Sequence, residues 1–467
     1  MKKLYIVLLI LTGIFIALLM GYFILRHGNR EKVVDETRTV FIKKTENRYQ
    51  LFRNGKPFYI QGAGGDSHFK ELAEIGGNTI RLYDTINLSE ALNEAQRNNL
   101  AVIVDIPLPR FNTQYNPYLA EENNRILKEN LKSTIQKYKN HPAVLIWNLG
   151  NELQYPIVFP KNRIIQNFDD LIAIIKVVSQ RRSFINTFND LIEMVHEEDP
   201  NHPVSTSVAT DKFWKRLLNI HLYSPELDLI GYNIFAPPKK FISQLDKLSQ
   251  LIEMKPFYIS EWGIEGPWAQ EKTAWGAPIE TTSTNKEKQY RENHFILCNY
   301  YSESLGSVAF YWGQKQERTH TWFNIFDKEG RKSQVFYELQ NLWKSKIDST
   351  TFPPKIKYML LAKKGAMDNL VFNPNEITKA QLFFENAIDS TLKYNWEIYE
   401  EEWNYGGEGV AHKMPNEILG CFEKIEDSVA IIRIPSVEGP YRVFVNVYDE
   451  QGNFATTNTP FYVLNSK

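Results

Sequence analysis

The sequence predicts a (β/α)8 TIM barrel followed by a C-terminal immunoglobulin-like β-sandwich, with an N-terminal transmembrane helix. Short apolar runs alternate with helical patterns through the first three quarters of the chain, and this alternation ends after Lys346, where short strands begin. An uncharged apolar segment opens the chain. The predicted parts are a transmembrane anchor (4–25), a juxtamembrane linker (26–47), the barrel (48–347) and the sandwich (348–467).

Composition sets the broad class of the protein. A chain of 467 residues with 43% hydrophobic side chains is too long for one ordinary core, so two folded domains are expected. Its 54 lysines and arginines balance 55 aspartates and glutamates, and a net charge of −1 provides no field to attract nucleic acid. Cys298 and Cys421 lie far apart, and the nine histidines lack an HExxH or HxH spacing. We therefore expect no nucleic-acid partner, no catalytic metal and no cofactor.

The N-terminus carries the candidate membrane anchor. Residues 4–25 contain no charged side chain and are long enough to cross a bilayer, which takes about 20 residues. Lys2 and Lys3 precede the segment and Arg26 follows it. Neither a small-x-small cleavage site nor a cysteine for lipidation lies near its end, so an uncleaved single-pass anchor is favoured over a signal peptide.

The barrel is expected to begin after a hairpin whose turn is Asn54-Gly55. The eight predicted strands cover residues 57–62, 78–83, 101–106, 143–149, 204–208, 229–234, 256–260 and 307–312. Helical patterns between them cover residues 67–75, 89–98, 121–138, 174–197, 241–251 and 286–304. Eight such units favour a closed barrel over a doubly wound sheet. The Gly-rich stretch at 62–69 lacks both the GxGxxG spacing and a GK[ST] ending, so no nucleotide is expected.

The C-terminal part has a different pattern. After the stretch STTFPPK at 349–355, short segments alternate apolar and polar residues at the spacing of a β-sandwich. Asp449 to Gly452 is a predicted turn between two of these strands.

Two predicted strands end in a glutamate. Glu152 follows the run VLIWNLGN and Glu261 follows PFYIS, so both lie at the C-terminal ends of buried parallel strands, where βα-barrels build their active sites. A glutamate after a strand is often a solvated loop residue. Asn151 directly before the first glutamate and Trp262 directly after the second favour the catalytic interpretation.

These motifs resemble the retaining glycoside hydrolases of clan A. IWNLGNE and HEEDPNHPVSTS are similar to the catalytic barrel of family 2, and GGNTIRLYDT and ISEWG are also similar to the family 72 β-glucanosyltransferases. The resemblance covers residues 50–345 and implies that Glu152 is the acid/base and Glu261 the nucleophile. Retention requires two carboxyl groups about 5–5.5 Å apart, one protonated and one ionised. We expect apolar surroundings and the neighbouring carboxylate to raise the pKa of Glu152.

The resemblance also implies roles for neighbouring side chains. Arg81, at the end of the second predicted strand, is the expected cation beside the nucleophile; the alternative is a surface arginine. Asn151 is expected to contact the sugar hydroxyl beside the reacting carbon, and Trp312 to form the floor under the sugar unless it is a core residue. Four tryptophans are expected either to stack on sugars at subsites along a groove or to pack within the loops: Trp262, Trp268, Trp275 and Trp322.

One departure from the clan pattern lies after the sixth predicted strand. Many clan members have a Tyr there that donates a hydrogen bond to the nucleophile, whereas this chain has Phe235, with Asn233 retained and Tyr232 on the other face of a regular strand. The hydrogen bond must then come from another residue, or catalysis is weakened. Family 2 enzymes also usually carry β-domains before the barrel, where this chain has its apolar segment.

The leading hypothesis is a membrane-anchored retaining glycoside hydrolase that acts on neutral β-linked oligo- or polysaccharide. The same residues suit a β-glucanosyltransferase that passes the glycosyl group to another sugar. A non-catalytic carbohydrate-binding surface protein is the alternative from another class, favoured only by Phe235. Since the expected substrate is extracellular glycan, we place the body outside the cytoplasm.

Overall fold

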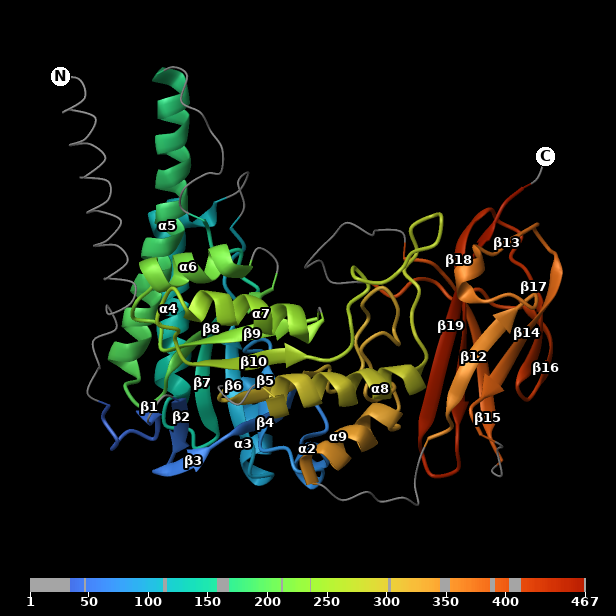
Figure 1. The fold of residues 1–467 in the computed structure, drawn as a ribbon, viewed down its shortest axis with the longest axis horizontal. Helices are drawn as coiled ribbons and strands as arrows, with labels where there is room; N and C mark the ends of the chain where they lie inside the picture. Colours follow the sequence, from blue (N-terminus) through green and yellow to red (C-terminus); the bar gives the residue numbers. More distant parts are fainter. Residues whose placement is uncertain are drawn as a thin grey trace. The chain divides into compact units, whose positions relative to one another are not determined.

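The computed structural model describes residues 34–45, 48–111, 116–157, 168–210, 213–235, 237–300, 304–344, 353–386, 391–402 and 413–465 (Figure 1). The predicted membrane anchor at 4–25 and the predicted boundary at 347 lie outside these residues. No helix in the described part of the chain combines the length and the apolar character needed to cross a bilayer.

Eight strands form the closed barrel that the sequence predicts. In chain order they are β4 (Ile60–Gly64), β5 (Thr79–Leu82), β6 (Ala101–Ile106), β7 (Val144–Asn151), β8 (Val204–Ala209), β9 (Leu229–Ile234), β10 (Phe257–Trp262) and β11 (Gly306–Phe310). Their order around the barrel is β10-β11-β4-β5-β6-β7-β8-β9, and the pairs from β5 to β9 are parallel. Near-continuous burial of β6, β7, β9 and β10 explains why these segments are apolar runs in the sequence.

Helices connect the strands (Figure 1), and α3 contacts β6 while α5 contacts β8. They are α2 (Phe69–Glu74), α3 (Leu88–Arg97), α4 (Glu121–Tyr138), α5 (Phe168–Glu198), α6 (Phe213–Tyr223), α7 (Pro238–Ser249), α8 (Ser283–His294) and α9 (Gln334–Lys344), with shorter helical turns η1 (Pro117–Leu119), η2 (Phe295–Tyr300) and η3 (Ala366–Asp368). The sequence patterns did not predict α6 and α9. Both contain aromatic residues of low helix propensity, which packing against the rest of the fold overrides.

A small antiparallel sheet precedes the barrel. It consists of β1 (Val40–Thr45), β2 (Arg48–Arg53) and β3 (Lys56–Phe58), and Asn54 and Gly55 at the β2–β3 turn have φ values of 51° and 71°, so the predicted hairpin is confirmed. Because residues 56–58 pair with β2, the first barrel strand begins only at Ile60. Val40 and Leu51 from this sheet pack with strand residues such as Tyr258 in one apolar cluster.

The C-terminal part is a β-sandwich of two four-stranded sheets. One has the order β12 (Ile356–Leu361), β14 (Ile377–Phe384), β17 (Val429–Arg433) and β16 (Phe422–Glu426); the other has β13 (Val371–Phe372), β19 (Phe454–Val463), β18 (Gly439–Tyr448) and β15 (Lys393–Glu400). Trp396, Ile398, Val445 and Phe461 lie in the core that both sheets share. The predicted turn at Asp449 is confirmed, since its carboxylate accepts hydrogen bonds from the N–H groups of Gln451 and Asn453, both at 2.9 Å.

The chain divides into two compact units that do not coincide with barrel and sandwich. The first contains Met1–Gly62, Asn78–Glu261 and Tyr301–Val308, and the second contains Ala63–Gly77, Trp262–Tyr300 and Ala309–Lys467. Within the second unit the sandwich contacts α8, and Ser283 Oγ accepts a hydrogen bond from the Thr456 N–H at 3.0 Å. The loop that follows β10 is therefore part of the same compact unit as the sandwich.

Candidate active site

The two predicted glutamates occupy different backbone settings in the first unit. Glu261 lies within β10, 3% exposed. Glu152 directly follows β7 and has a φ of 51°, which is unusual for a non-glycine residue, and Gly150 before it has a φ of 76°. The pairing of β7 with β8 is irregular here, and the Glu152 N–H donates to the Ser207 carbonyl at 2.9 Å. This bulge turns the chain at the end of the strand and fixes the backbone of Glu152.

Arg81, in β5, is completely buried and hydrogen-bonds Glu261. Its Nη1 donates to Glu261 Oε1 and to the Ser260 carbonyl, both at 2.9 Å. Its Nε and Nη2 donate to the two carboxylate oxygens of Asp105 at 3.1 and 2.6 Å, and Nη2 also donates to Asn151 Oδ1 at 2.9 Å. The predicted cation beside Glu261 is thus present, and the alternative of a surface arginine is wrong.

Asn233 links the two glutamates. Its Nδ2 donates to Glu152 Oε1 at 2.9 Å and to Asn151 Oδ1 at 3.0 Å. Its Oδ1 accepts from Ser260 Oγ at 2.7 Å and from Arg81 Nη1 at 3.4 Å. The structure therefore brings five of the predicted residues into one hydrogen-bonded network: Arg81, Asn151, Glu152, Asn233 and Glu261.

The electrostatics of this network depend on burial and on the Arg81–Asp105 pair. Burial opposes the charge on Arg81, but the Asp105 carboxylate, with smaller contributions from Tyr83 and Glu261, outweighs it and raises the pKa of the guanidinium well above its usual value. Burial raises the pKa of Asp105, against the opposing attraction of Arg81. One cation thus faces two carboxylates, Asp105 and Glu261, in a dry environment.

Three polar residues that support the site were not predicted from the sequence. Asp105 pairs with Arg81; Asn148 donates to Asp105 Oδ1 at 2.8 Å; Ser260 contacts Asn233. A signal for two of them is present in the sequence, because Asp105 and Asn148 interrupt the otherwise apolar strands AVIVDI and VLIWNLGN. A buried polar side chain in such a strand requires a partner.

Two predicted substrate-binding tryptophans are fully buried in the second unit. The Trp262 ring lies 5.4 Å from Tyr290 and 5.5 Å from His294, and Trp312 donates its Nε1–H to the His68 carbonyl at 3.1 Å. Neither indole exposes a face on which a sugar could stack. In this conformation both are packing residues, and their sugar contacts stay a prediction.

The other three tryptophans are in different environments. Trp268 is 56% exposed. Trp275 lies 5.7 Å from the ring of Tyr462 in the sandwich, and Trp322 is buried and donates to the Glu265 carbonyl at 3.1 Å. Of this group, Trp268 retains the surface that a stacking subsite needs.

At the position of the clan tyrosine this chain has Phe235, whose side chain cannot donate a hydrogen bond to Glu261. Phe235, 8% exposed, directly follows β9 and has no group to donate. Tyr232 packs between Phe241 and Phe257, at ring distances of 5.3 and 5.2 Å, as expected for the other face of the strand. Arg81 Nη1 does donate a hydrogen bond to Glu261, at 2.9 Å.

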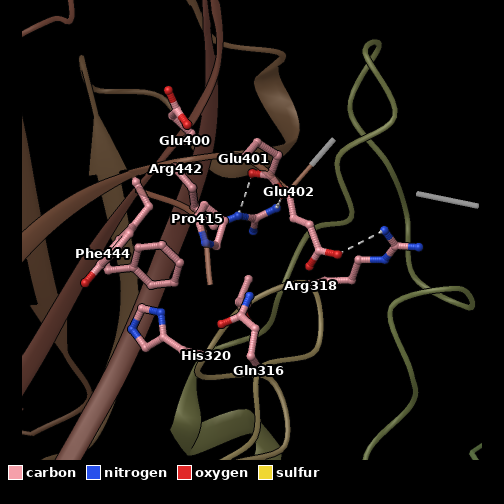
Figure 2. A pocket seen from close by; sticks show the side chains of 11 residues that line it. Gln316, Arg318, His320, Glu400, Glu401, Glu402, Pro415, Arg442 and Phe444 are labelled. Atoms are coloured by element: carbon pink, nitrogen blue, oxygen red, sulfur yellow. Dashed lines mark hydrogen bonds and ion pairs between the residues drawn. The ribbon is translucent and has the colours of Figure 1, made fainter. Parts of the chain in front are cut away.

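A small cavity lies in the second unit, and none of the residues predicted as the site lines it (Figure 2). Its volume of about 10 Å³ accommodates about one water molecule. Arg442 and Glu401 form a buried ion pair at its wall, with Nε···Oε2 and Nη2···Oε1 distances of 2.8 Å, and Glu402 lies 4.0 Å from Arg318. Within the described residues, no group of three or more His, Cys, Asp and Glu side chains is arranged to hold a metal ion.

Part of the barrel is similar to a known family of enzymes. The family model of the TIM barrel domain of glycosyl hydrolases family 2 matches residues 84–265. Over 136 residues the chain is 30% identical to β-glucuronidase of Pongo abelii and 29% identical to that of Homo sapiens. These alignments cover 25% of this chain and 19% of each relative, so the match spans less than a fifth of the relatives' length.

Two β-glucuronidase structures are similar to this chain, both with TM-scores below 0.5. β-D-glucuronidase of Dictyoglomus thermophilum is 20% identical, with 67% of this chain and 54% of that chain covered and a TM-score of 0.48. Bacteroides uniformis β-glucuronidase 2, bound covalently to cyclophellitol-6-carboxylate aziridine, is 14% identical, with 91% and 48% covered and a TM-score of 0.48. The predicted similarity to family 72 stays a prediction. The match over residues 84–265 agrees with the resemblance to the family 2 barrel of clan A that the sequence motifs predicted.

Proposed function

We propose that the protein is a retaining β-glycosidase in which Glu261 is the nucleophile and Glu152 the general acid and then base. The observation that supports this most directly is the network through Arg81 and Asn233, which hydrogen-bonds each glutamate from a different side. Arg81 donates to Glu261 and so favours the ionised, attacking form. Glu152 is the more exposed of the two carboxyl groups, as a group must be to reach a leaving oxygen.

The reaction proceeds by double displacement. Glu261 attacks the anomeric carbon while Glu152 gives its proton to the departing oxygen, and Glu152 then removes a proton from the incoming water, which hydrolyses the glycosyl-enzyme ester. Asn151 Oδ1 accepts from Arg81 and from Asn233, which leaves its Nδ2 as the group that donates to a substrate. We assign this amide to the sugar hydroxyl beside the reacting carbon.

The substrate that we propose is a neutral β-linked oligo- or polysaccharide. A uronic acid presents a carboxylate, which sites commonly meet with arginine. Arg81 is engaged by Asp105, Glu261, Asn151 and Ser260, so it is not available to a substrate carboxylate. A β-glucuronide is nevertheless the second candidate, because the similar proteins are named β-glucuronidases.

Aryl β-glycosides of glucose, galactose, mannose and glucuronic acid test the activity and the substrate together. We expect turnover of a neutral glycoside that Glu261→Gln abolishes, because the amide is nearly isosteric but cannot attack. Glu121→Gln, on exposed α4, is the matched control and should leave the rate unchanged. Turnover of the glucuronide alone would show that the substrate is a β-glucuronide and not a neutral glycoside. Undiminished turnover in Glu261→Gln would overturn the assignment of Glu261 as the nucleophile.

The reaction products distinguish hydrolysis from transfer of the glycosyl group to another sugar. Incubation with β-linked oligosaccharides and analysis by mass yields shorter sugars for a hydrolase and longer ones for a transglycosylase, because the choice depends on how an acceptor competes with water. Binding of oligosaccharide without any product would favour the non-catalytic carbohydrate-binding protein.

For the N-terminal segment we propose a single-pass anchor at residues 4–25 with the body outside the cytoplasm. The uncharged length of this segment supports the proposal. The full chain should sediment with membranes and resist carbonate extraction, whereas residues 34–467 should not. Protease added to intact cells should digest the body; protection of the body would reverse the orientation.

A further inference from the structure

Asp105 is a charged residue inside an apolar barrel strand. It is 1% exposed, and the other residues of β6 are Ala101, Val102, Ile103, Val104 and Ile106. A carboxylate at such a position is strongly unfavourable unless it is paired. Arg81 satisfies this requirement with two hydrogen bonds, at 3.1 and 2.6 Å.

This pair determines where the remaining donors of Arg81 point. Guanidinium has five N–H bonds in a rigid plane, so fixing Nε and one hydrogen of Nη2 on Asp105 leaves the other Nη2 hydrogen and both Nη1 hydrogens in set directions. Those directions lead to Asn151 Oδ1, Glu261 Oε1 and the Ser260 carbonyl. The orientation of Asp105 therefore fixes the contact that Arg81 makes with Glu261.

A second layer of hydrogen bonds fixes Asp105 itself. Asn148 Nδ2 donates to Asp105 Oδ1 at 2.8 Å. Asn148 Oδ1 in turn accepts from Ser205 Oγ at 2.7 Å and from Ser207 Oγ at 3.3 Å, so the amide can present only its NH2 group to the carboxylate. All of these side chains are buried or nearly so, and the chain of bonds runs from β8 through β7 to β6.

We propose that Asp105 is a positioning residue for catalysis, which orients Arg81 and offsets enough of its charge to keep Glu261 nucleophilic. This inference rests on the proposed function. A carboxylate that faces an unopposed guanidinium is a weaker base and a weaker nucleophile, because attack removes the negative charge that the cation stabilises. Asp105 shares the cation and so moderates that stabilisation.

The variant Asp105→Asn tests the charge. The amide keeps the shape and one acceptor for Arg81, but Glu261 then faces a full positive charge. We expect the acidic limb of the pH profile of kcat/KM, which reports ionisation of the nucleophile, to shift down by about one pH unit. We expect kcat at the optimum to fall about 10- to 100-fold. An acidic limb at the wild-type pH would overturn the proposal.

Asp199→Asn is the matched control. Asp199 is equally buried, accepts from Trp147 Nε1 at 2.8 Å and pairs with His202, but it contacts none of the proposed catalytic residues. Loss of its charge should change stability and leave the acidic limb in place. If both variants shift the limb equally, the effect is a general response to losing a buried charge, and the proposal fails.

Asp105→Glu keeps the charge and moves the carboxylate, so it tests whether Asp105 orients Arg81. It is also the variant to use if Asp105→Asn does not fold. We expect the acidic limb to stay at the wild-type pH while kcat falls at least tenfold with KM little changed. Wild-type kcat in this variant would overturn the proposal. A wild-type protein without glycosidase activity would overturn both this inference and the proposed function. If the wild type is active but Asp105→Asn leaves the acidic limb of the pH profile at the wild-type pH, this inference alone is overturned.

Discussion

Asn233 donates its amide N–H to Glu152 Oε1 at 2.9 Å, while its carbonyl oxygen accepts from Ser260 Oγ. The variant Asn233→Asp keeps the acceptor and replaces the donor with an oxygen that faces Glu152. A like charge raises the pKa of a carboxyl group, so the basic limb of kcat/KM, which reports loss of the general acid's proton, should shift up by about one pH unit. A pH profile from pH 4 to 10 measures this, and a basic limb that does not move would contradict the role of Glu152.

The backbone of Glu152 depends on Gly150. Gly150 has a φ of 76°, and a Cβ there would lie 2.5 Å from Leu153 Cγ. Gly150→Ala should therefore lower the free energy of unfolding by about 2–4 kcal/mol and reduce kcat, because strain and the clash both displace the bulge. Urea unfolding and initial rates measure the two effects.

Gly55→Ala is the control for that variant. Gly55 has a similar φ of 71°, but no atom lies within 4 Å of its Cβ position. It should lose only about 1 kcal/mol from backbone strain and keep wild-type kcat. Equal losses in both variants would show that the packing of Leu153 is unimportant.

Arg442 connects the sandwich to the loop that follows β10. It pairs with Glu401, and it donates to Asn458 Oδ1 at 2.7 Å and to the Pro278 carbonyl at 2.8 Å. Asn458 in turn donates to Glu280 Oε2 at 2.6 Å. Arg442→Met leaves the Glu401 carboxylate buried without its cation, and we expect a loss of about 3–5 kcal/mol of unfolding free energy.

Arg433→Met in the same sandwich is the comparison. Its partner Glu423 is 2.5 Å away, but both side chains are more than 40% exposed. Solvent screens such a pair, so the loss should be below about 1 kcal/mol. Similar losses for Arg433→Met and Arg442→Met in urea unfolding would contradict the importance of burial.

His221 makes stability depend on pH. Its Nδ1–H donates to the Leu217 carbonyl and its Nε2 accepts from the Lys255 N–H at 3.1 Å, so the folded protein requires the neutral ring. Burial lowers the pKa of His221 to about 4, against about 6.5 in the unfolded chain. Between these values the unfolded state binds more protons, so stability falls as the pH drops from about 6.5 toward 4.

His221→Gln should reduce this pH dependence by about 2–2.5 kcal/mol between pH 7 and pH 4.5. His294 provides a second test, since burial also lowers the pKa of that ring to about 4. Urea unfolding at both pH values measures the change. If the wild type and His221→Gln lose the same stability on acidification, His221 does not contribute.

The pattern of the sequence predicted the barrel and much of the site because both follow from local rules. Buried parallel strands are apolar runs, and counting them places a residue at a strand end, as for Glu152 and Glu261. Arg81 and Asn233 were assigned to the site through the resemblance to clan A, whose pattern they match. The start of the first barrel strand at Ile60 could not be predicted from the sequence, because residues 56–58 fit the hairpin pattern and the strand pattern equally well.

Only the tertiary structure decided which buried polar side chains form hydrogen bonds and ion pairs with one another. Asp105 lies 24 residues from Arg81, and Glu261 lies 180 residues from it, so no local pattern connects the three. The burial of Trp262 against α8 and the joining of the loop after β10 to the sandwich through Arg442 likewise depend on contacts between distant segments. A sequence records where charge and apolar surface lie along the chain, but pairing of buried charges is settled only when folding removes water from around them.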